Sequence, residues 1–92
     1  MKNYAVYCKK MPYNGHGDKF LYKLTNPLDI DGIDDPVQYI IVSSVTFEGE
    51  DETVIFPSNK DGKPLSLKGI YSEPGLDPDS AIKNAGWEVY CG

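Results

Sequence analysis

The sequence "VQYIIVSSVTF", residues 37–47, is the stretch that decides the fold. From Tyr39 to Val45 it is almost continuously apolar and β-branched, a pattern typical of a strand with both faces at least partly covered. Pro36 stands directly before it, and the acidic turn "EGEDE" at 48–52 is expected directly after it. We therefore expect a central strand here, with other strands on both sides.

Shorter strand patterns surround this segment, separated by residues that favour turns. Two alternating runs near the N-terminus predict a hairpin with a long loop, and a run after the acidic turn predicts a return strand that ends at its proline. A short edge strand followed by a turn at "SEPG", and then a final strand, are expected further on. In chain order these runs are "NYAVYC" (3–8), "KFLYKL" (19–24), "TVIFP" (53–57), "PLSLKGIY" (64–71) and "WEVYC" (87–91).

The segment "DPDSAIKNAG", residues 77–86, predicts the helix of this chain. Asp77 is a good N-cap, and Gly86 is placed to end the helix in a left-handed turn. Ala81 and Ile82 fall on one face of the helix. About nine residues do not hold a helix in water alone, so this face must pack on the sheet.

Together these elements predict an α+β fold in a single domain over residues 1–92. The expected architecture is a small antiparallel or mixed sheet of about five strands, with one short C-terminal helix packed on a face and then a final strand. A chain of this length has enough apolar material for one sheet layer covered by one helix.

Charge is divided unevenly along the chain. The net charge is −5, and all nine basic residues are lysines. Residues 1–23 carry +4, residues 24–59 carry −8 with no lysine, and residues 60–92 carry −1, which sums to −5. The missing arginine and the acidic middle argue against nucleic-acid binding, because that binding relies on basic side chains.

The residue types that carry catalysis are scarce. The single histidine, His16, lies between two glycines, and no nucleophile–base pair can be named from the sequence. We therefore expect no enzymatic activity, no cofactor and no metal. The start of the chain lacks a signal-peptide pattern, and no segment is long enough to span a membrane, which predicts a cytoplasmic protein. Cys8 and Cys91 are then expected as reduced thiols, although a bond between them stays open.

The loop "DIDGIDD", residues 29–35, invites comparison with a calcium-binding loop. Counted from Asp29, acids stand at positions 1 and 3, but position 5 is Ile33 and the glycine, Gly32, falls at position 4 instead of 6. Position 12 is Ile40, inside the central strand. We predict no specific calcium site, while weak divalent binding by clustered carboxylates stays open.

Residues 39–90 resemble a known pattern. "YIIVSSV", "ETVIFPSNKDGKPL" and "GLDPDSAIKNAGWEVY" are similar to the succession of strand, "ET.IFP" strand, "DG" turn and final helix in small uncharacterised accessory proteins of tailed phages. The matching residues are those assigned to core, turns and caps. The resemblance implies the fold and a phage origin, and it transfers no active site.

These observations predict a non-enzymatic protein-binding module, a phage accessory protein that binds or inhibits a host or defence protein through an acidic surface. The expected partner has a basic surface. One alternative is a small-ligand or metabolite-binding protein that uses the glycine-rich loop and tyrosines, and another is a charged surface without a partner. The candidate contact residues are Asp29, Asp31, Asp34, Asp35, Glu48, Glu50, Asp51, Glu52, Tyr13 and Tyr71.

The two acidic segments flank the central strand. About ten strand residues separate them by roughly 33 Å, so they are expected at opposite ends of the sheet. We therefore expect two separate contacts, or only one that matters, and not a continuous acidic patch.

Overall fold

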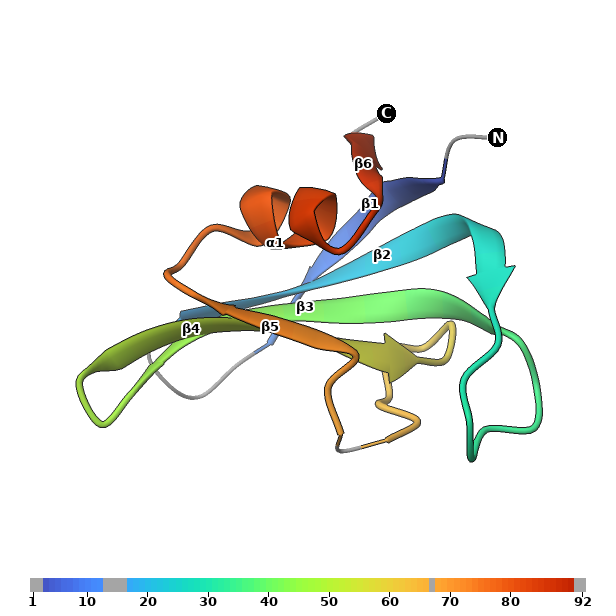
Figure 1. The fold of residues 1–92 in the computed structure, drawn as a ribbon, viewed down its shortest axis with the longest axis horizontal. Helices are drawn as coiled ribbons and strands as arrows, with labels where there is room; N and C mark the ends of the chain where they lie inside the picture. Colours follow the sequence, from blue (N-terminus) through green and yellow to red (C-terminus); the bar gives the residue numbers. More distant parts are fainter. Residues whose placement is uncertain (1–2, 13–16, 67, 91–92) are drawn as a thin grey trace.

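A computed structural model describes residues 3–12, 17–66 and 68–90. Strands β1 to β5 form an antiparallel meander, and the last strand, β6, pairs parallel with β1, which gives the sheet order β5-β4-β3-β2-β1-β6. The mixed sheet curls into a half-barrel (Figure 1). Its elements are β1 (Tyr4–Met11), β2 (Gly17–Leu28), β3 (Val37–Phe47), β4 (Glu50–Ser58), β5 (Tyr71–Pro74), α1 (Pro78–Asn84) and β6 (Glu88–Tyr90).

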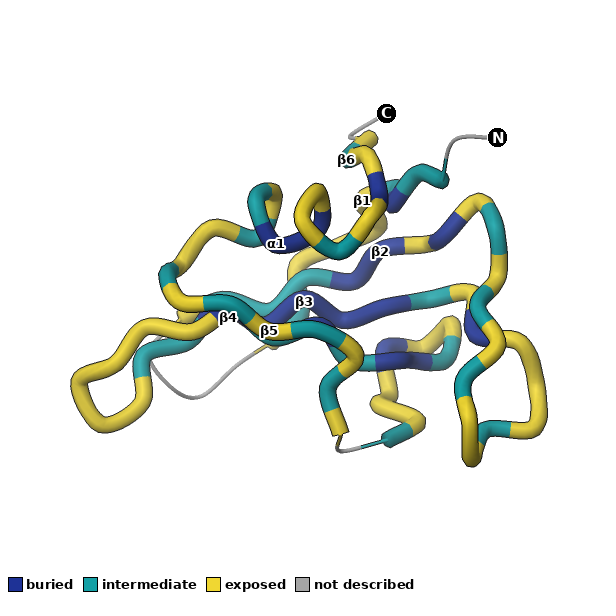
Figure 2. Tube along the Cα trace, in the orientation of Figure 1, coloured by how far each residue is buried: buried dark blue, intermediate teal, exposed yellow. Residues whose placement is uncertain are grey.

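Strand β3 lies in the interior of the sheet and is partly covered on both faces, as its sequence predicts. It pairs with β2 on one side and β4 on the other. Ile40 and Val42 belong to the core cluster under α1, whereas Ile41 points to the opposite face and is also buried. Figure 2 shows the buried residues gathered along the middle of the sheet, with exposed residues at both ends.

Helix α1 connects the two edges of the sheet across one face (Figure 1). The chain leaves β5 at one edge, passes over the sheet as α1 and joins the other edge as β6. Within the described residues, no helix is long and apolar enough to cross a membrane. The main core lies between α1 and the sheet and consists of Ala5, Tyr22, Leu24, Ile40, Val42, Ile55, Ala81, Ile82 and Trp87.

Both helix ends are capped as the sequence predicts, although the helix has seven residues instead of about nine. The Asp77 carboxylate accepts a hydrogen bond from the Ser80 N–H at 3.1 Å. Gly86 adopts φ 111°, and the Trp87 N–H donates to the Ile82 carbonyl at 3.1 Å. This is a Schellman turn, which returns the Trp87 ring to the core beside Ile82.

The opposite face of the sheet is covered partly by a loop, residues 59–65. Gly62 lies so close to Met11 and Leu21 that a side chain at this position would clash with the Met11 methyl group. The Asn59 side chain accepts hydrogen bonds from two backbone N–H groups of the loop, each at 2.9 Å. The loop therefore shields Leu21, which is 2% exposed, from water.

Three expectations about the second half of the chain were wrong. Pro57 does not end its strand, because β4 continues to Ser58 and Pro57 pairs with Ile40. The acidic turn is only two residues long, Glu48–Gly49, so Glu50 pairs with Phe47 and already belongs to β4. The edge strand lies at Tyr71–Pro74, where a turn was expected. Its position is fixed because the Gly75 N–H donates to the Asp51 carbonyl and the buried Thr53 hydroxyl donates to the Gly75 carbonyl.

We expect the contact between α1 and the sheet to dominate stability. Ile82→Ala should lower the free energy of unfolding by about 2 to 4 kcal/mol, because it removes buried methyl groups and leaves a cavity. Asp77→Ala should cost about 1 kcal/mol through loss of the N-cap. Urea unfolding measures both, with the exposed Lys83→Ala as control. If the unfolding curves of Ile82→Ala and Asp77→Ala overlay that of the wild type, α1 does not belong to the core.

Candidate functional site

The two acidic segments lie at opposite ends of β3, as expected. The loop 29–35 precedes Val37, and the turn Glu48–Gly49 follows Phe47. Each segment must therefore be judged by its own surroundings.

The turn between β3 and β4 holds a residue in an unfavourable backbone conformation. Glu48 has φ 53° and Gly49 has φ 80°, the two left-handed positions that a tight two-residue hairpin requires. Asn-Gly is the preferred pair in such turns, whereas a left-handed conformation costs an ordinary residue about 1 to 2 kcal/mol. A glutamate is thus found where an asparagine would fit the fold better.

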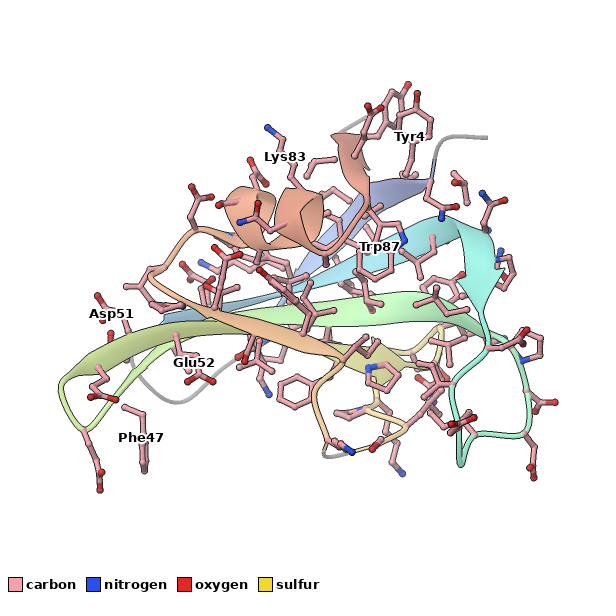
Figure 3. The ribbon with its side chains drawn as sticks, viewed as in Figure 1. Tyr4, Phe47, Asp51, Glu52, Lys83 and Trp87 are labelled. Atoms are coloured by element: carbon pink, nitrogen blue, oxygen red, sulfur yellow. The ribbon has the colours of Figure 1, made fainter. Side chains whose placement is uncertain are left out.

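Phe47, the last residue of β3, is the most exposed large hydrophobic residue that the structure describes. Its side chain is 73% exposed and does not belong to the core cluster. Figure 3 shows the ring projecting from the hairpin on the side of the sheet away from α1. Glu50 stands directly across from it on β4. The end of the hairpin therefore presents an uncovered aromatic ring beside a carboxylate.

The carboxylates of β4 divide between the two faces of the sheet. Because side chains alternate along a strand, Glu50 and Glu52 share the face of Phe47. Asp51 points to the other face, where its carboxylate accepts a hydrogen bond of 2.6 Å from the Thr46 hydroxyl. Asp51 and Glu52 accordingly lie on opposite sides of the ribbon (Figure 3).

A hollow of about 710 Å³ lies beside the Phe47 ring. Carboxylates and apolar groups line it together, and none of the described lining residues is a lysine. This end of the molecule could thus receive a group that is both basic and apolar. The lining residues are Val45, Phe47, Glu50, Asp51, Glu52, Ser72, Glu73 and Pro74.

The other acidic loop has different surroundings. Ile30 and Ile33 close a turn through a 3.1 Å backbone hydrogen bond, and both line a cleft against residues 65–70. Lys68 and Asp31 line the same cleft. The isoleucines give this loop a packing role, and a lysine of the neighbouring loop lines the same cleft.

The remaining aspartates of this loop, Asp29, Asp34 and Asp35, are exposed. Among the described residues, no three acidic, histidine or cysteine side chains gather closely enough to hold a metal ion. The absence of a specific calcium site stays a prediction until titration tests it.

Tyr71 has a structural position that the sequence did not reveal. Its hydroxyl donates a hydrogen bond of 3.0 Å to the Glu73 carboxylate, and its ring packs against the core. Ser80 and Asn84 of α1 donate to the same carboxylate at 3.3 and 2.9 Å. The hydrogen bond to Glu73 raises the pKa of Tyr71 above its usual range. Tyr71 thus helps to attach β5 to α1.

Tyr13, the other predicted contact tyrosine, lies outside the described residues, as do His16 and Cys91. Cys8 is exposed.

Tyrosine rings line one small hollow of about 330 Å³, where Tyr4 and Tyr90 meet edge to face with ring centroids 6.4 Å apart. Thr25 also lines it, and its hydroxyl already accepts the Tyr4 N–H. Few polar groups remain there to orient a small ligand.

Glu48→Asn should raise the free energy of unfolding by up to about 1 kcal/mol, because asparagine adopts the left-handed conformation at lower cost. Urea unfolding measures this. Glu50→Gln is the control, since it removes a neighbouring charge without changing a turn residue. An equal gain in both variants would attribute the effect to charge repulsion and not to backbone strain.

No family model, curated protein or solved structure matches this chain. The resemblance to tailed-phage accessory proteins therefore stays an expectation.

Proposed function

We propose that this protein is a non-enzymatic protein-binding module, and that its contact surface is the hairpin tip, defined as Phe47, Glu48, Glu50 and Glu52. The partner carries an apolar pocket bordered by lysine or arginine side chains. One observation carries this proposal: the Phe47 ring is 73% exposed at the end of an interior strand, beside carboxylates.

An exposed phenylalanine has a clear physical use in binding. Burying one such side chain is worth about 1.5 to 3 kcal/mol. Aromatic residues that enter a pocket on a partner are frequent anchors of protein interfaces, surrounded by contacts that contribute less energy. The Phe47 ring projects from the hairpin on the side of the sheet away from α1 (Figure 3). The ring supplies the affinity in this proposal.

The surrounding carboxylates orient the basic partner and raise the rate of association. Glu48, Glu50 and Glu52 are exposed, so their attraction to a basic partner is long-ranged and weakened by salt. Exposed charges of this kind change the association rate more than the final affinity.

The strained turn supports the same surface. Glu48 keeps a left-handed backbone conformation although asparagine would fit the turn better. Unfavourable backbone conformations cluster at functional sites, where the side chain serves a purpose other than folding. In this proposal the purpose is a carboxylate held at the tip of the hairpin.

The non-enzymatic character is supported by the hydrogen bonds around Glu73. A hydroxyl, a carboxylate and an amide side chain meet there. The Glu73 carboxylate accepts hydrogen bonds from Tyr71, Ser80 and Asn84, an arrangement that attaches α1 to β5. A carboxylate shared among three donors is poorly placed to activate the Ser80 hydroxyl as a nucleophile.

The resemblance over residues 39–90 supports a phage accessory protein that binds or inhibits a host or defence protein in the cytoplasm of a bacterium. The hairpin tip gives this role a definite contact surface, and the loop 29–35 is assigned to packing.

Affinity capture from bacterial lysate tests the hairpin tip. Proteins that bind the wild type should be lost with Phe47→Ser and with the pair Glu50→Lys and Glu52→Lys. They should be retained with Asp34→Asn and Asp35→Asn, the control at the other acidic loop. Capture should also weaken between about 0.1 M and 1 M salt, as the Debye length falls from about 10 to 3 Å.

The reverse pattern would contradict the proposal. If the loop variants lose the captured protein and the tip variants keep it, the contact lies at residues 29–35. If every variant keeps it, neither acidic segment is the contact.

A further inference from the structure

The hollow beside the hairpin tip continues along the sheet. A second hollow, of about 570 Å³, shares Glu52 and Ser72 with the first and extends to Gly69 and Ile70. Because they share these two residues, we treat the two hollows as one groove along the face of the sheet that carries the Glu50 and Glu52 side chains. We name it the β4 groove, with a floor made by alternate residues of β4: Glu50, Glu52, Val54 and Phe56.

The β4 groove changes in chemistry along its length. At the hairpin end, four acidic residues line the groove, and two of them, Glu50 and Glu52, lie on its floor beside Phe47. At the far end, the floor is apolar and Ile70, which is 38% exposed, stands beside it. None of the described residues that line the groove is a lysine. Unlike the cleft at Lys68, this groove has no positive charge of its own to balance its carboxylates.

The interval between neighbouring side chains on the groove floor matches an extended peptide better than a helix. Alternate residues of a strand lie about 6.8 Å apart on one face, and an extended peptide presents its own side chains at the same interval. A helix, which rises about 5.4 Å per turn, does not keep this register.

We infer that the β4 groove binds an extended segment of the partner protein with two basic residues at alternate positions, followed two positions later by an apolar residue. The basic side chains lie over Glu50 and Glu52, and the apolar side chain lies against Val54 and Ile70. This inference rests on the proposed function and specifies which kind of partner segment meets the hairpin tip.

The contact differs from strand addition at a sheet edge. Pro74 lies in the edge strand β5 and offers no N–H to an added strand, which protects that edge. The segment is therefore recognised mainly by its side chains on the face of the sheet. Ser72, which is exposed and lines both hollows, stands at the middle of the contact.

Fluorescence anisotropy with labelled seven-residue peptides tests the inference on the full-length protein. The probe is Ser-Lys-Thr-Lys-Thr-Leu-Thr. A peptide of the same composition, Lys-Lys-Thr-Thr-Thr-Leu-Ser, lacks the alternation, and Ser-Glu-Thr-Glu-Thr-Leu-Thr reverses the charge. The probe should bind at least about ten-fold more tightly than either control, a difference well resolved between weak affinities.

Two protein variants locate the binding. Ser72→Arg, which fills the middle of the groove with a positive side chain, should weaken probe binding by about ten-fold or more. Gln38→Arg introduces the same side chain at an exposed position of β3 outside both hollows, and it should leave probe binding within about two-fold of the wild type.

Equal binding of the three peptides, no effect of Ser72→Arg, or no binding up to about 1 mM would overturn the inference. These outcomes are separable from failure of the hairpin tip. If lysate capture still depends on Phe47 while the peptides do not distinguish spacing, the tip contact stands and the extended segment does not. If lysate capture does not depend on Phe47 either, both the tip contact and the extended segment are contradicted.

Discussion

The packing of α1 against the sheet through Ile82 and Trp87 is the interaction on which the rest of the structure depends. Helix α1 joins the two edges of the sheet, so the caps at Asp77 and Gly86 set where β6 can meet β1. Seven helical residues reach only about 10 Å, whereas the eleven residues of β3 extend over roughly 36 Å. One short helix therefore covers the middle of the sheet and leaves its ends to other segments.

The two ends of the sheet, which α1 does not cover, differ in what covers them. At one end, the loops around Ile33 and Gly62 fold back and pack, and Lys68 brings positive charge toward Asp31. At the other end, the β3–β4 hairpin extends beyond the helix and is exposed at its end (Figure 2). No comparable loop among the described residues covers it, and Phe47 stays exposed. The same shortage of covering structure that limits the core thus creates the surface proposed for binding.

Local patterns in the sequence predicted the parts of the fold that depend on neighbouring residues. The continuous apolar run of β3 and the caps of α1 are of this kind. The edge strand was misplaced because its register depends on Thr53 and Asp51, about twenty residues away. The two acidic segments looked equivalent in sequence, and only the fold brings Lys68 to one of them. Phe47 was missed because a phenylalanine at the end of an apolar strand is expected in the core. Its place directly before a two-residue turn was the available signal.

The central claim is that the Phe47 ring is free for a partner because it contributes little to folding. Urea unfolding of Phe47→Ser tests this claim most directly, with Ile40→Ala as the reference for a core residue. The exposed ring predicts a free energy of unfolding within about 0.5 kcal/mol of the wild type. A loss of about 2 kcal/mol or more, the range of core substitutions such as Ile40→Ala, would show that the ring is part of the core and contradict the proposed contact surface.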